Sequence, residues 1–402
     1  MMGLRRLASW TTHQLEHTFA SEMDPHARKT ILANHMPRIL FEDMTSRCSA
    51  DMPPTDLYIA GLPCQPFSKG GQRRGLADPR GRLFSHALEY ISVHRPRVIL
   101  LENYEGLASW KCGVALAQWI ADLEDLKYNV HWKVINTEDH GVPQHRRRVY
   151  VVAIRADADT GSFEWPFAIP PVDVDSFLDS ENGSHLELPS SRTAQANIKA
   201  AISRIQHSGG DPHCEPWVMD CDSSSDRIQG RAMYNRVPCI TRARGRGHWL
   251  LHRCRRLSVV EMLRLQGIDP EHVRIVVSRT QIGYQIGNAM SQNVVERLLV
   301  RCLQAANLVP CGYLCDRWEV AAACRRQQAL RPAELPPAQA VDVGQVSLSA
   351  LKGAIKRVVK KRPDILVGRM RKKLAKRLGT SEVALQQWDS VVMALAVEQA
   401  MC

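Results

Sequence analysis

The sequence lacks the features that would place the chain in a membrane or outside the cell. No run of about 18 apolar residues, the length that crosses a bilayer, occurs in it. Its N-terminus has no continuous apolar stretch of the kind that a secretory signal needs. The twelve cysteines of the 402 residues are scattered and include no CxxC pair, so we expect reduced structural thiols and no metal site. These absences favour a soluble intracellular chain without a membrane partner.

Basic residues outnumber acidic ones, and one segment accounts for most of the excess positive charge. The formal net charge is +12, and residues 347–379 contribute +11 of it, with twelve Lys or Arg against the single acid Asp364. Apolar residues recur at helical spacing within this segment, so we expect a small basic helical bundle that binds phosphates without sequence preference. A nuclear-import signal and a solvated basic face are the alternatives.

Between residues 16 and 154 short apolar runs alternate with amphipathic stretches. This rhythm is typical of a doubly wound α/β fold, in which helices cover a parallel sheet. We expect strands at residues 18–21, 56–60, 98–102, 130–136 and 148–154, and helices at 83–91 and 114–123. A hydrophobic content of 45% is sufficient for a sizeable core.

Changes in this rhythm divide the chain into five parts. Residues 1–155 form the α/β domain, and residues 156–254, which are irregular, predict a smaller domain of loops and short strands. Residues 255–310 return to the α/β domain with helices from Ser258, where Glu261 completes a capping box, and from Ser291. A Pro-rich and Ala-rich linker, 311–345, precedes the basic helical tail, 346–402.

Reactive side chains stand at the ends of three predicted strands. Cys64 follows strand 56–60 in a turn rich in glycine and proline, and Glu102 and Asn103 end strand 98–102. Arg146 and Arg148 open strand 148–154. Open α/β sheets place their sites at one edge, so we expect these groups to converge.

Five motifs in order and spacing resemble the cytosine-C5 DNA methyltransferase family. They read GLPCQPFS at 61–68, DPRGRLF at 78–84, LLEN at 100–103, GVPQHRRR at 141–148 and QIGNAM at 285–290, and RLQG at 264–267 also fits. The resemblance covers residues 16 to about 308. One such motif arises easily by chance, but five in the family's order do not.

The resemblance implies a covalent mechanism. Cytosine C5 is a weak nucleophile, so the Cys64 thiolate would first add to C6 and convert the ring to an enamine. Glu102 would act at the base N3, Asn103 would orient its loop, and Arg146 and Arg148 would favour the thiolate, one or both also holding the base O2. Loss of the C5 proton and of Cys64 would then release the product.

The resemblance also implies S-adenosylmethionine as the methyl donor. Glu22 would bind its ribose hydroxyls, Met23 would pack on its adenine, and Asp43 would lie near the adenine amine. Three further residues, Leu83, Asn288 and Met290, would line the rest of the pocket.

DNA is the expected substrate, with tRNA as a less favoured alternative. A stacked base is out of reach of Cys64, so the reaction implies base flipping, and residues 156–254 lie where the family has its target-recognition domain. Five arginines there and just beyond it would contact phosphates, with Trp249 filling the space of the flipped base: Arg242, Arg244, Arg246, Arg255 and Arg256. We expect a monomer, located in the nucleus or, for a bacterial enzyme, in the cytoplasm.

The chain departs from the family before residue 18. The family begins with a first strand and a Phe-x-Gly-x-Gly turn that approaches the cofactor. Gly3 is the single glycine among residues 1–17, so this turn is missing from them. We therefore expect the chain to bind the cofactor weakly or not at all. We also expect the second and fourth strands of the family's order to lack the first strand, which normally lies between them. An N-terminally shortened enzyme and a catalytically inactive DNA-binding relative are the two interpretations.

Overall fold

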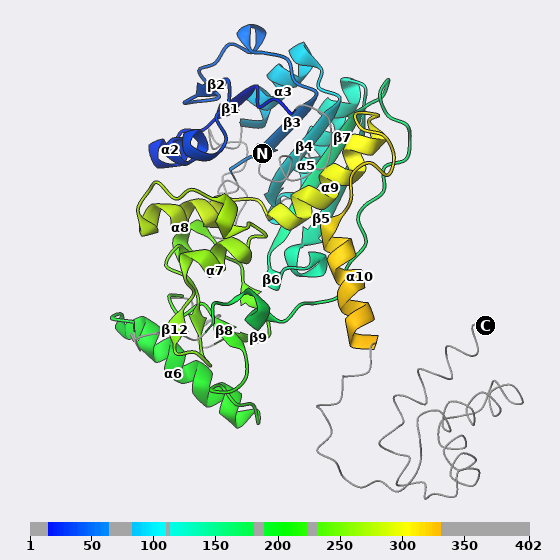
Figure 1. Ribbon diagram of the computed structural model, residues 1–402. Coiled ribbons are helices and arrows are strands. Elements are labelled where there is room, and N and C mark those ends of the chain that lie inside the picture. The colour runs from blue at the N-terminus through cyan, green and yellow to red at the C-terminus, as the bar shows by residue number, and fades with distance from the viewer. Residues whose placement is uncertain (1–14, 64–82, 110–112, 181–188, 224–230, 331–402) are drawn as a thin grey trace, which may run out of the picture. The chain divides into compact units, whose positions relative to one another are not determined.

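A computed structural model describes residues 15–63, 83–109, 113–180, 189–223 and 231–330, with side chains up to residue 326 (Figure 1). The predicted nucleophile Cys64 and the predicted basic tail lie outside these ranges. The chain divides into two units, residues 1–322 and 323–402, and nearly all described residues belong to the first.

Within the described ranges, six strands of the α/β lobe form two sheets. In the smaller one, β1 (Phe19–Ser21) and β2 (Ile39–Phe41) pair in parallel, with α2 (Pro25–Asn34) between them in the chain. The larger one has the order β3 (Leu57–Gly61), β4 (Val98–Tyr104), β7 (Arg147–Arg155), β5 (Tyr128–Asn136). Among the described residues no ladder joins β1 to β3. Strand β2 was not among the predicted strands.

Strand β7 makes the larger sheet mixed. β3 and β4 are parallel, but β7 runs antiparallel to both of its neighbours, β4 and β5. The short connection 137–146, with η5 (Thr137–His140) and β6 (Gln144–His145), joins β5 to β7. A parallel return needs a crossover of about a dozen residues or more, so the chain turns back beside β5. The prediction of a wholly parallel sheet is therefore wrong at this strand.

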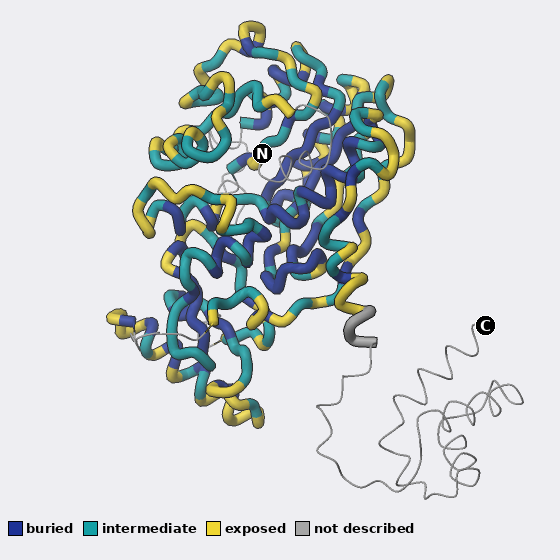
Figure 2. Tube along the Cα trace, viewed as in Figure 1, coloured by how far each residue is buried: buried dark blue, intermediate teal, exposed yellow. Residues whose placement is uncertain are grey.

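The two faces of the larger sheet are both covered, as the buried strands in Figure 2 show. Ile99 and Leu101 of β4 pack with α3 (Leu83–His94) and α5 (Val114–Asp125), whereas Val98 and Leu100 pack toward α9 (Gln292–Ala305). Side chains alternate along a strand. Glu102, two residues beyond Leu100, therefore belongs to the α9 face.

The region after residue 156 is more regular than the sequence predicts. Strands β12 (Arg255–Arg256), β11 (Trp249–Leu250), β8 (Trp217–Met219) and β9 (Ala232–Tyr234) form an antiparallel sheet. The 16-residue helix α6 (Arg192–His207) covers it with Ala194, Ile198 and Ile205, whose helical spacing is the missed signal. Trp249 is 2% exposed in this core, so its predicted role beside a flipped base is wrong.

Two helices beyond residue 255 pack with this region. α7 (Val259–Arg264), whose predicted capping box is confirmed, and α8 (Arg279–Asn288) share a core with β10 (Val237–Pro238), across the boundary predicted at 254/255. Strand β10 pairs with β6 and so attaches this region to the α/β lobe. The remaining short elements are η1 (Ser49–Asp51), α4 (Gly106–Ser109), η6 (Val174–Phe177), η7 (Arg242–Arg244) and η8 (Pro270–His272).

Helix α10 (Arg317–Leu330) occupies part of the predicted linker. Its first turn is attached to α9, because Arg297, which is fully buried, donates to Asp316 Oδ2 at 2.7 Å and Trp318 Nε1 donates to Glu296 Oε2 at 2.8 Å. No helix in the described ranges is both long enough and apolar enough to cross a bilayer.

Candidate active site

The carboxylate of Glu102 and the guanidinium of Arg148 lie together at the ends of β4 and β7. In the ladder Glu102 stands opposite Tyr150 and Tyr104 opposite Arg148, so Glu102 and Arg148 are diagonal neighbours on one face. Glu102 Oε1 lies 3.1 Å from Arg148 Nε, and the two side chains are 9% and 11% exposed. Burial raises the pKa of the Glu102 carboxyl, and the charges of Arg148 and Arg146 only partly oppose this.

Asn103 connects this pair to the segment that leads to Cys64. Its side chain is 1% exposed, and Nδ2 donates to the carbonyl of Leu62 at 3.3 Å, while Oδ1 accepts the backbone N–H of Tyr104. Leu62 N–H also donates to the Glu102 carbonyl at 3.3 Å. The chain therefore leaves β3 directly beside Glu102, two residues before the predicted nucleophile.

Arg146 has a different environment from Arg148. It is 2% exposed, and its guanidinium donates to the carbonyls of Ile240 at 2.8 Å and Ala289 at 2.7 Å. Gln144 and Gln266, both fully buried, continue this network, and Ile240 N–H donates to Gln144 Oε1 at 3.0 Å. These contacts hold the start of β7 against the segment after β10 and the end of α8.

Cys239, which belongs to none of the sequence motifs, lies between the two arginines. Its sulfur is 3.6 Å from Nη1 of Arg146 and 3.6 Å from Nη2 of Arg148. The only sequence signal is its position one residue before Ile240, next to the basic run that begins at Arg242. Arg148 therefore contacts both the α/β lobe, through Glu102, and the segment after β10.

The predicted cofactor residues follow the carboxyl ends of parallel strands. After β1, Glu22 Oε1 accepts the backbone N–H of Asp24 at 2.8 Å, and Met23 exposes 67% of its surface. After β2, the backbone N–H of Thr45 donates to Asp43 at 2.8 Å and holds the pKa of that carboxyl below its usual value.

Three further predicted cofactor residues come from other elements. Leu83 is the first residue of α3, and Asn288 is the exposed last residue of α8. Met290 lies against Gly61 at the end of β3, where a Cβ atom would be 3.0 Å from Met290 Cε and 3.7 Å from Glu102 Oε2. A residue without a side chain at position 61 therefore leaves room between Met290 and Glu102.

The five predicted DNA-contacting arginines divide into two groups. Arg244 is ion-paired with Asp220 at 2.6 Å, Arg255 with Glu261 at 2.6 Å and Arg256 with Asp222 at 2.7 Å. Arg242 and Arg246 are exposed, and Arg246 makes no hydrogen bond or ion pair with another described residue.

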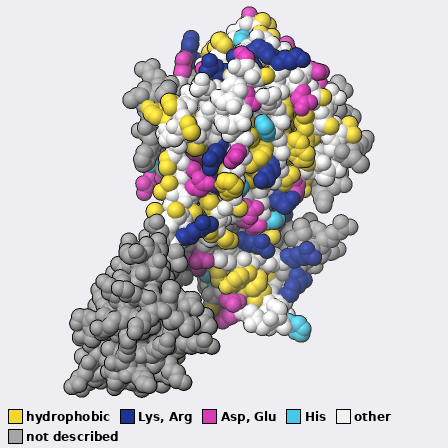
Figure 3. All heavy atoms as spheres, turned by 90° about the vertical axis from the view of Figure 1, so that its right-hand side faces the viewer, with side chains coloured by type: hydrophobic (Ala, Val, Ile, Leu, Met, Phe, Trp, Pro, Cys, Tyr) yellow, Lys and Arg dark blue, Asp and Glu magenta, His cyan; other side chains and the backbone are white. Residues whose placement is uncertain are grey.

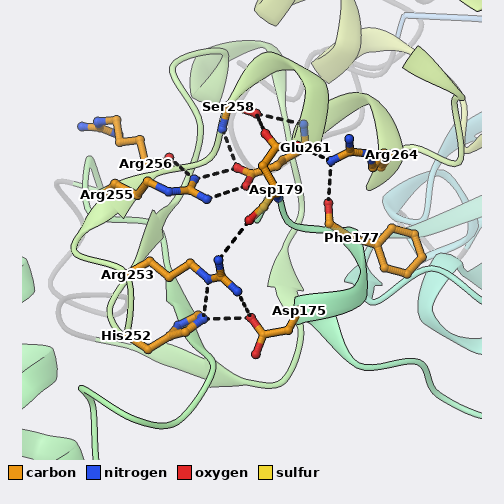
Figure 4. A network of polar contacts seen from close by, with 10 residues as sticks. All are labelled: Asp175, Phe177, Asp179, His252, Arg253, Arg255, Arg256, Ser258, Glu261 and Arg264. Carbon is orange, nitrogen blue, oxygen red and sulfur yellow. Dashed lines mark hydrogen bonds and ion pairs between the residues drawn. The ribbon is translucent and has the colours of Figure 1, made fainter. Parts of the chain in front are cut away.

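Arg255 belongs to a polar network that Figure 4 shows from close by, together with Arg253, Arg264 and Glu261. Glu261 is fully buried, and its carboxylate accepts hydrogen bonds from both terminal nitrogens of Arg255 and from the backbone N–H of Ser258. Burial alone would raise the pKa of the Glu261 carboxyl, but these contacts outweigh it and the pKa is lowered. This network attaches β12 to the start of α7.

Charges of both signs are mixed on the face of the molecule in Figure 3, where Lys and Arg lie among Asp and Glu. That face shows no continuous basic stripe across the described residues.

Curated relatives of similar sequence are bacterial methyltransferases. The chain is 31% identical over 282 residues to the type II methyltransferase M.NgoBI of Neisseria gonorrhoeae, which covers 70% of this chain and 84% of the relative. It is 29% identical over 296 residues to M.HaeII of Haemophilus aegyptius, covering 73% and 87%.

Solved methyltransferase structures share the fold. The methyltransferase EhMeth of Entamoeba histolytica has a TM-score of 0.55 at 16% identity, covering 76% of this chain and 95% of that one. A putative DNA modification methyltransferase encoded in an Escherichia coli prophage has a TM-score of 0.52 at 19% identity, covering 76% and 96%. The described lobe thus has the Rossmann-like methyltransferase fold.

The family comparison covers both the α/β lobe and the region attached to it. Residues 3–304 match the family described as "C-5 cytosine-specific DNA methylase". This range includes the predicted nucleophile, the Glu102–Arg148 pair and all the predicted cofactor residues. The chain belongs to the C-5 cytosine-specific DNA methylase family.

Proposed function

We propose that the chain transfers a methyl group to cytosine C5 in DNA through a covalent adduct with Cys64, on a base flipped out of the duplex. The observation that carries this proposal is the buried Glu102–Arg148 pair, with Asn103 holding the carbonyl of Leu62 beside it. Thiolate addition to a cytosine ring requires an acid and a cation. Glu102 and Arg148 provide these two groups beside the end of β3.

Glu102 is the group that meets the base N3. When the thiolate adds to C6, negative charge develops in the ring and N3 needs a proton or a strong hydrogen bond. Because burial raises the pKa of Glu102, this carboxyl keeps its proton to a higher pH than an ordinary glutamate. It is therefore suited to act as the acid, and we assign the base O2 to the guanidinium of Arg148, whose Nε lies 3.1 Å from Glu102 Oε1.

Arg146 has a positioning role in this proposal. Its guanidinium donates to carbonyls at Ile240 and Ala289 and so has little capacity left for a base. By fixing these two segments it sets the direction in which β7 presents Arg148. The base-binding function that the family resemblance gives to one or both arginines is thus assigned to Arg148.

S-adenosylmethionine, which the family uses, supplies the methyl group when bound. The residues present fit it: the carboxylate of Glu22 faces the turn after β1, the exposed Met23 offers an apolar surface, and Gly61 leaves space beside Met290. Glu22 would take the ribose hydroxyls and Met23 the adenine, with Asp43, Leu83, Asn288 and Met290 completing the pocket.

The proposed DNA contacts are made by the region after residue 156. Arg242 and Arg246 expose their side chains and are assigned to backbone phosphates. Arg244, Arg255 and Arg256 are engaged within the protein, so we assign them mainly to the rigidity of this region. The curated relatives are bacterial and give no support to the expected nuclear location. We propose that the chain acts as a monomer.

Methyl transfer from labelled cofactor to DNA and to tRNA tests the proposal. Wild type and Cys64→Ser are compared, with Arg301→Lys, a substitution far along α9, as a control for expression and handling. Cys64-dependent labelling of DNA supports the proposal. Labelling of tRNA alone would show that the substrate is RNA. DNA binding without labelling would show that the chain is a catalytically inactive DNA-binding relative of the family.

A further inference from the structure

Arg242 lies where the backbone of η7 directly contacts the backbone of α8. It begins η7, which packs against α8 at two glycines, where a Cβ at Gly283 would lie 2.1 Å from the Gly245 carbonyl oxygen. A Cβ at Gly287 would lie 2.4 Å from the backbone nitrogen of Arg242 itself. Helix and η7 thus touch through backbone, and any side chain at these glycines would separate them.

The side chain of Arg242 is nevertheless exposed. Its guanidinium lies over the ring of Tyr284, at 5.5 Å from the centroid, and 55% of the side chain is accessible. A guanidinium on an aromatic ring has a defined direction while its N–H groups remain available. Arg242 is therefore oriented for a ligand that lies outside the protein.

Asp24 is the acidic group that faces Arg242 from the α/β lobe. Its Oδ1 caps α2, accepting the N–H groups of His26 at 2.8 Å and Ala27 at 3.2 Å. Its Oδ2 lies 4.0 Å from Arg242 Nη2, and its side chain is 29% exposed. This contact is much longer than the 2.6 Å that joins Arg244 to Asp220, so Arg242 can change partner more readily.

Asp24 also belongs to the turn that carries the proposed cofactor residues. Its backbone N–H donates to Glu22 Oε1, and Arg28 donates to the carbonyl of Met23 in the same turn. The Asp24–Arg242 contact therefore joins the turn after β1 to the region that we assign to DNA.

We propose that Asp24 and a DNA backbone phosphate compete for Arg242, so that the Asp24–Arg242 contact must open when DNA binds. This inference rests on the proposed DNA methyltransferase function. A phosphate carries the same charge as Asp24 but brings additional acceptor oxygens, and it replaces a long ion pair by charge-assisted hydrogen bonds. Asp24 is then an intrinsic inhibitor of DNA binding.

Asp24→Asn separates this effect from helix capping. Asparagine caps helices as well as aspartate does, so α2 keeps its N-cap while the charge facing Arg242 is removed. Affinity for a duplex oligonucleotide, measured by fluorescence anisotropy at low salt, should rise about two- to fivefold, within the range expected for loss of one exposed ion pair. Thermal melting checks that the fold is unchanged.

A double-mutant cycle with Arg242→Gln isolates the competition. Removing an acid also lowers general repulsion of DNA, and that contribution persists in the Arg242→Gln background, whereas the competition does not. We expect Asp24→Asn to change affinity by less than about twofold there, and to keep its full effect in the matched background Arg246→Gln.

Two results would overturn the inference while the proposed function stands. One is equal tightening by Asp24→Asn with and without Arg242, and the other is no tightening in a wild-type chain that binds DNA. Absence of DNA binding by the wild type and by every variant would instead contradict the proposed function, and this inference with it.

Discussion

The Glu102 carboxylate lies 3.1 Å from the Arg148 guanidinium in a site where about nine-tenths of each side chain is buried. Replacing Arg148 by alanine should lower the single-turnover rate of methyl transfer about 100-fold, the usual effect of losing one preorganised donor to a developing charge. Arg148→Lys should recover little of the rate, because a lysine ammonium lacks the planar arrangement of N–H groups that lets arginine bind Glu102 and a base oxygen at the same time. A rate unchanged in Arg148→Ala would remove this residue from the active site.

Arg146→Met should act mainly on stability. The substitution leaves the carbonyls of Ile240 and Ala289 without their buried donor, and we expect a loss of about 2–5 kcal/mol in the free energy of unfolding. Urea denaturation measures this loss. Arg148→Met is the matched control. Compared with Arg146→Met, it should lower the rate of methyl transfer more and the free energy of unfolding less. The opposite result would show that Arg146 acts on the base and that Arg148 has the positioning role.

Glu102 should give methyl transfer a dependence on pH. Since the pKa of Glu102 is raised, the acid form is present below that pKa, and the rate of adduct formation should fall as the pH rises through it. Glu102→Gln keeps a hydrogen-bond donor but cannot transfer a proton, so its profile should be lower and should lack this decline. A wild-type rate that rises steadily over the same interval would contradict the assignment of Glu102 as acid.

Part of this site can be predicted from sequence because its residues stand in motifs that have the family's order and spacing. Strand order alone does not bring Glu102 to Arg148. Glu102 lies near the end of β4 and Arg148 near the start of β7, and these positions meet at one edge because β7 runs antiparallel to β4. The different roles of Arg146 and Arg148 could not be predicted, since they depend on whether carbonyls such as that of Ile240, distant in the chain, lie within reach. Sequence motifs carry no information about such tertiary contacts.

The region after residue 156 shows a similar limit. Its basic run predicts contacts with phosphates, but pairing of Arg255 with Glu261 and of Arg256 with Asp222 depends on how β12 and α7 pack. Helix α6 was missed because loop-forming residues on both sides of it dominated the segment, although Ala194, Ile198 and Ile205 recur at helical spacing. Strand β7 is antiparallel because the connection 137–146 is short, and the apolar pattern does not specify the path of that connection.

Two arginines of this region should respond differently to substitution. Arg246→Gln should weaken DNA binding and lower the salt slope by about one, as expected for loss of one phosphate contact, without changing stability. Arg256→Gln leaves the half-buried Asp222 unpaired and should lower the melting temperature, with a smaller effect on the salt slope. Anisotropy titrations over a series of salt concentrations distinguish the two, and identical salt slopes in both variants would contradict the division.

His140 should make stability depend on pH between its unfolded and folded pKa values. Burial, followed by the neighbouring charge of Arg297, lowers the pKa of His140 to about 4, from 6.5 in the unfolded chain. Arg297 donates to His140 Nδ1, so the folded state requires the neutral ring. The unfolded state therefore binds more protons, and stability should fall, by about 3 kcal/mol at most, as the pH falls from about 6.5 to about 4.

Urea denaturation across that interval, on wild type and His140→Asn, measures this contribution. The variant should be less stable at pH 7 but should lose less stability on acidification. Parallel curves for the two proteins would show that protonation of other groups, such as the paired carboxylates of the region after residue 156, accounts for the decline.

The central claim is that Cys64 forms a covalent bond to cytosine C6, and trapping that adduct tests it most directly. In DNA with fluorine at cytosine C5, the proton that must leave is absent, so an adduct that has received its methyl group cannot resolve. Incubation with cofactor should give a protein–DNA species that survives denaturing electrophoresis in wild type and is absent in Cys64→Ser. An adduct of equal yield in Cys64→Ser, or labelled methyl transfer to ordinary DNA without any trapped species, would contradict the account.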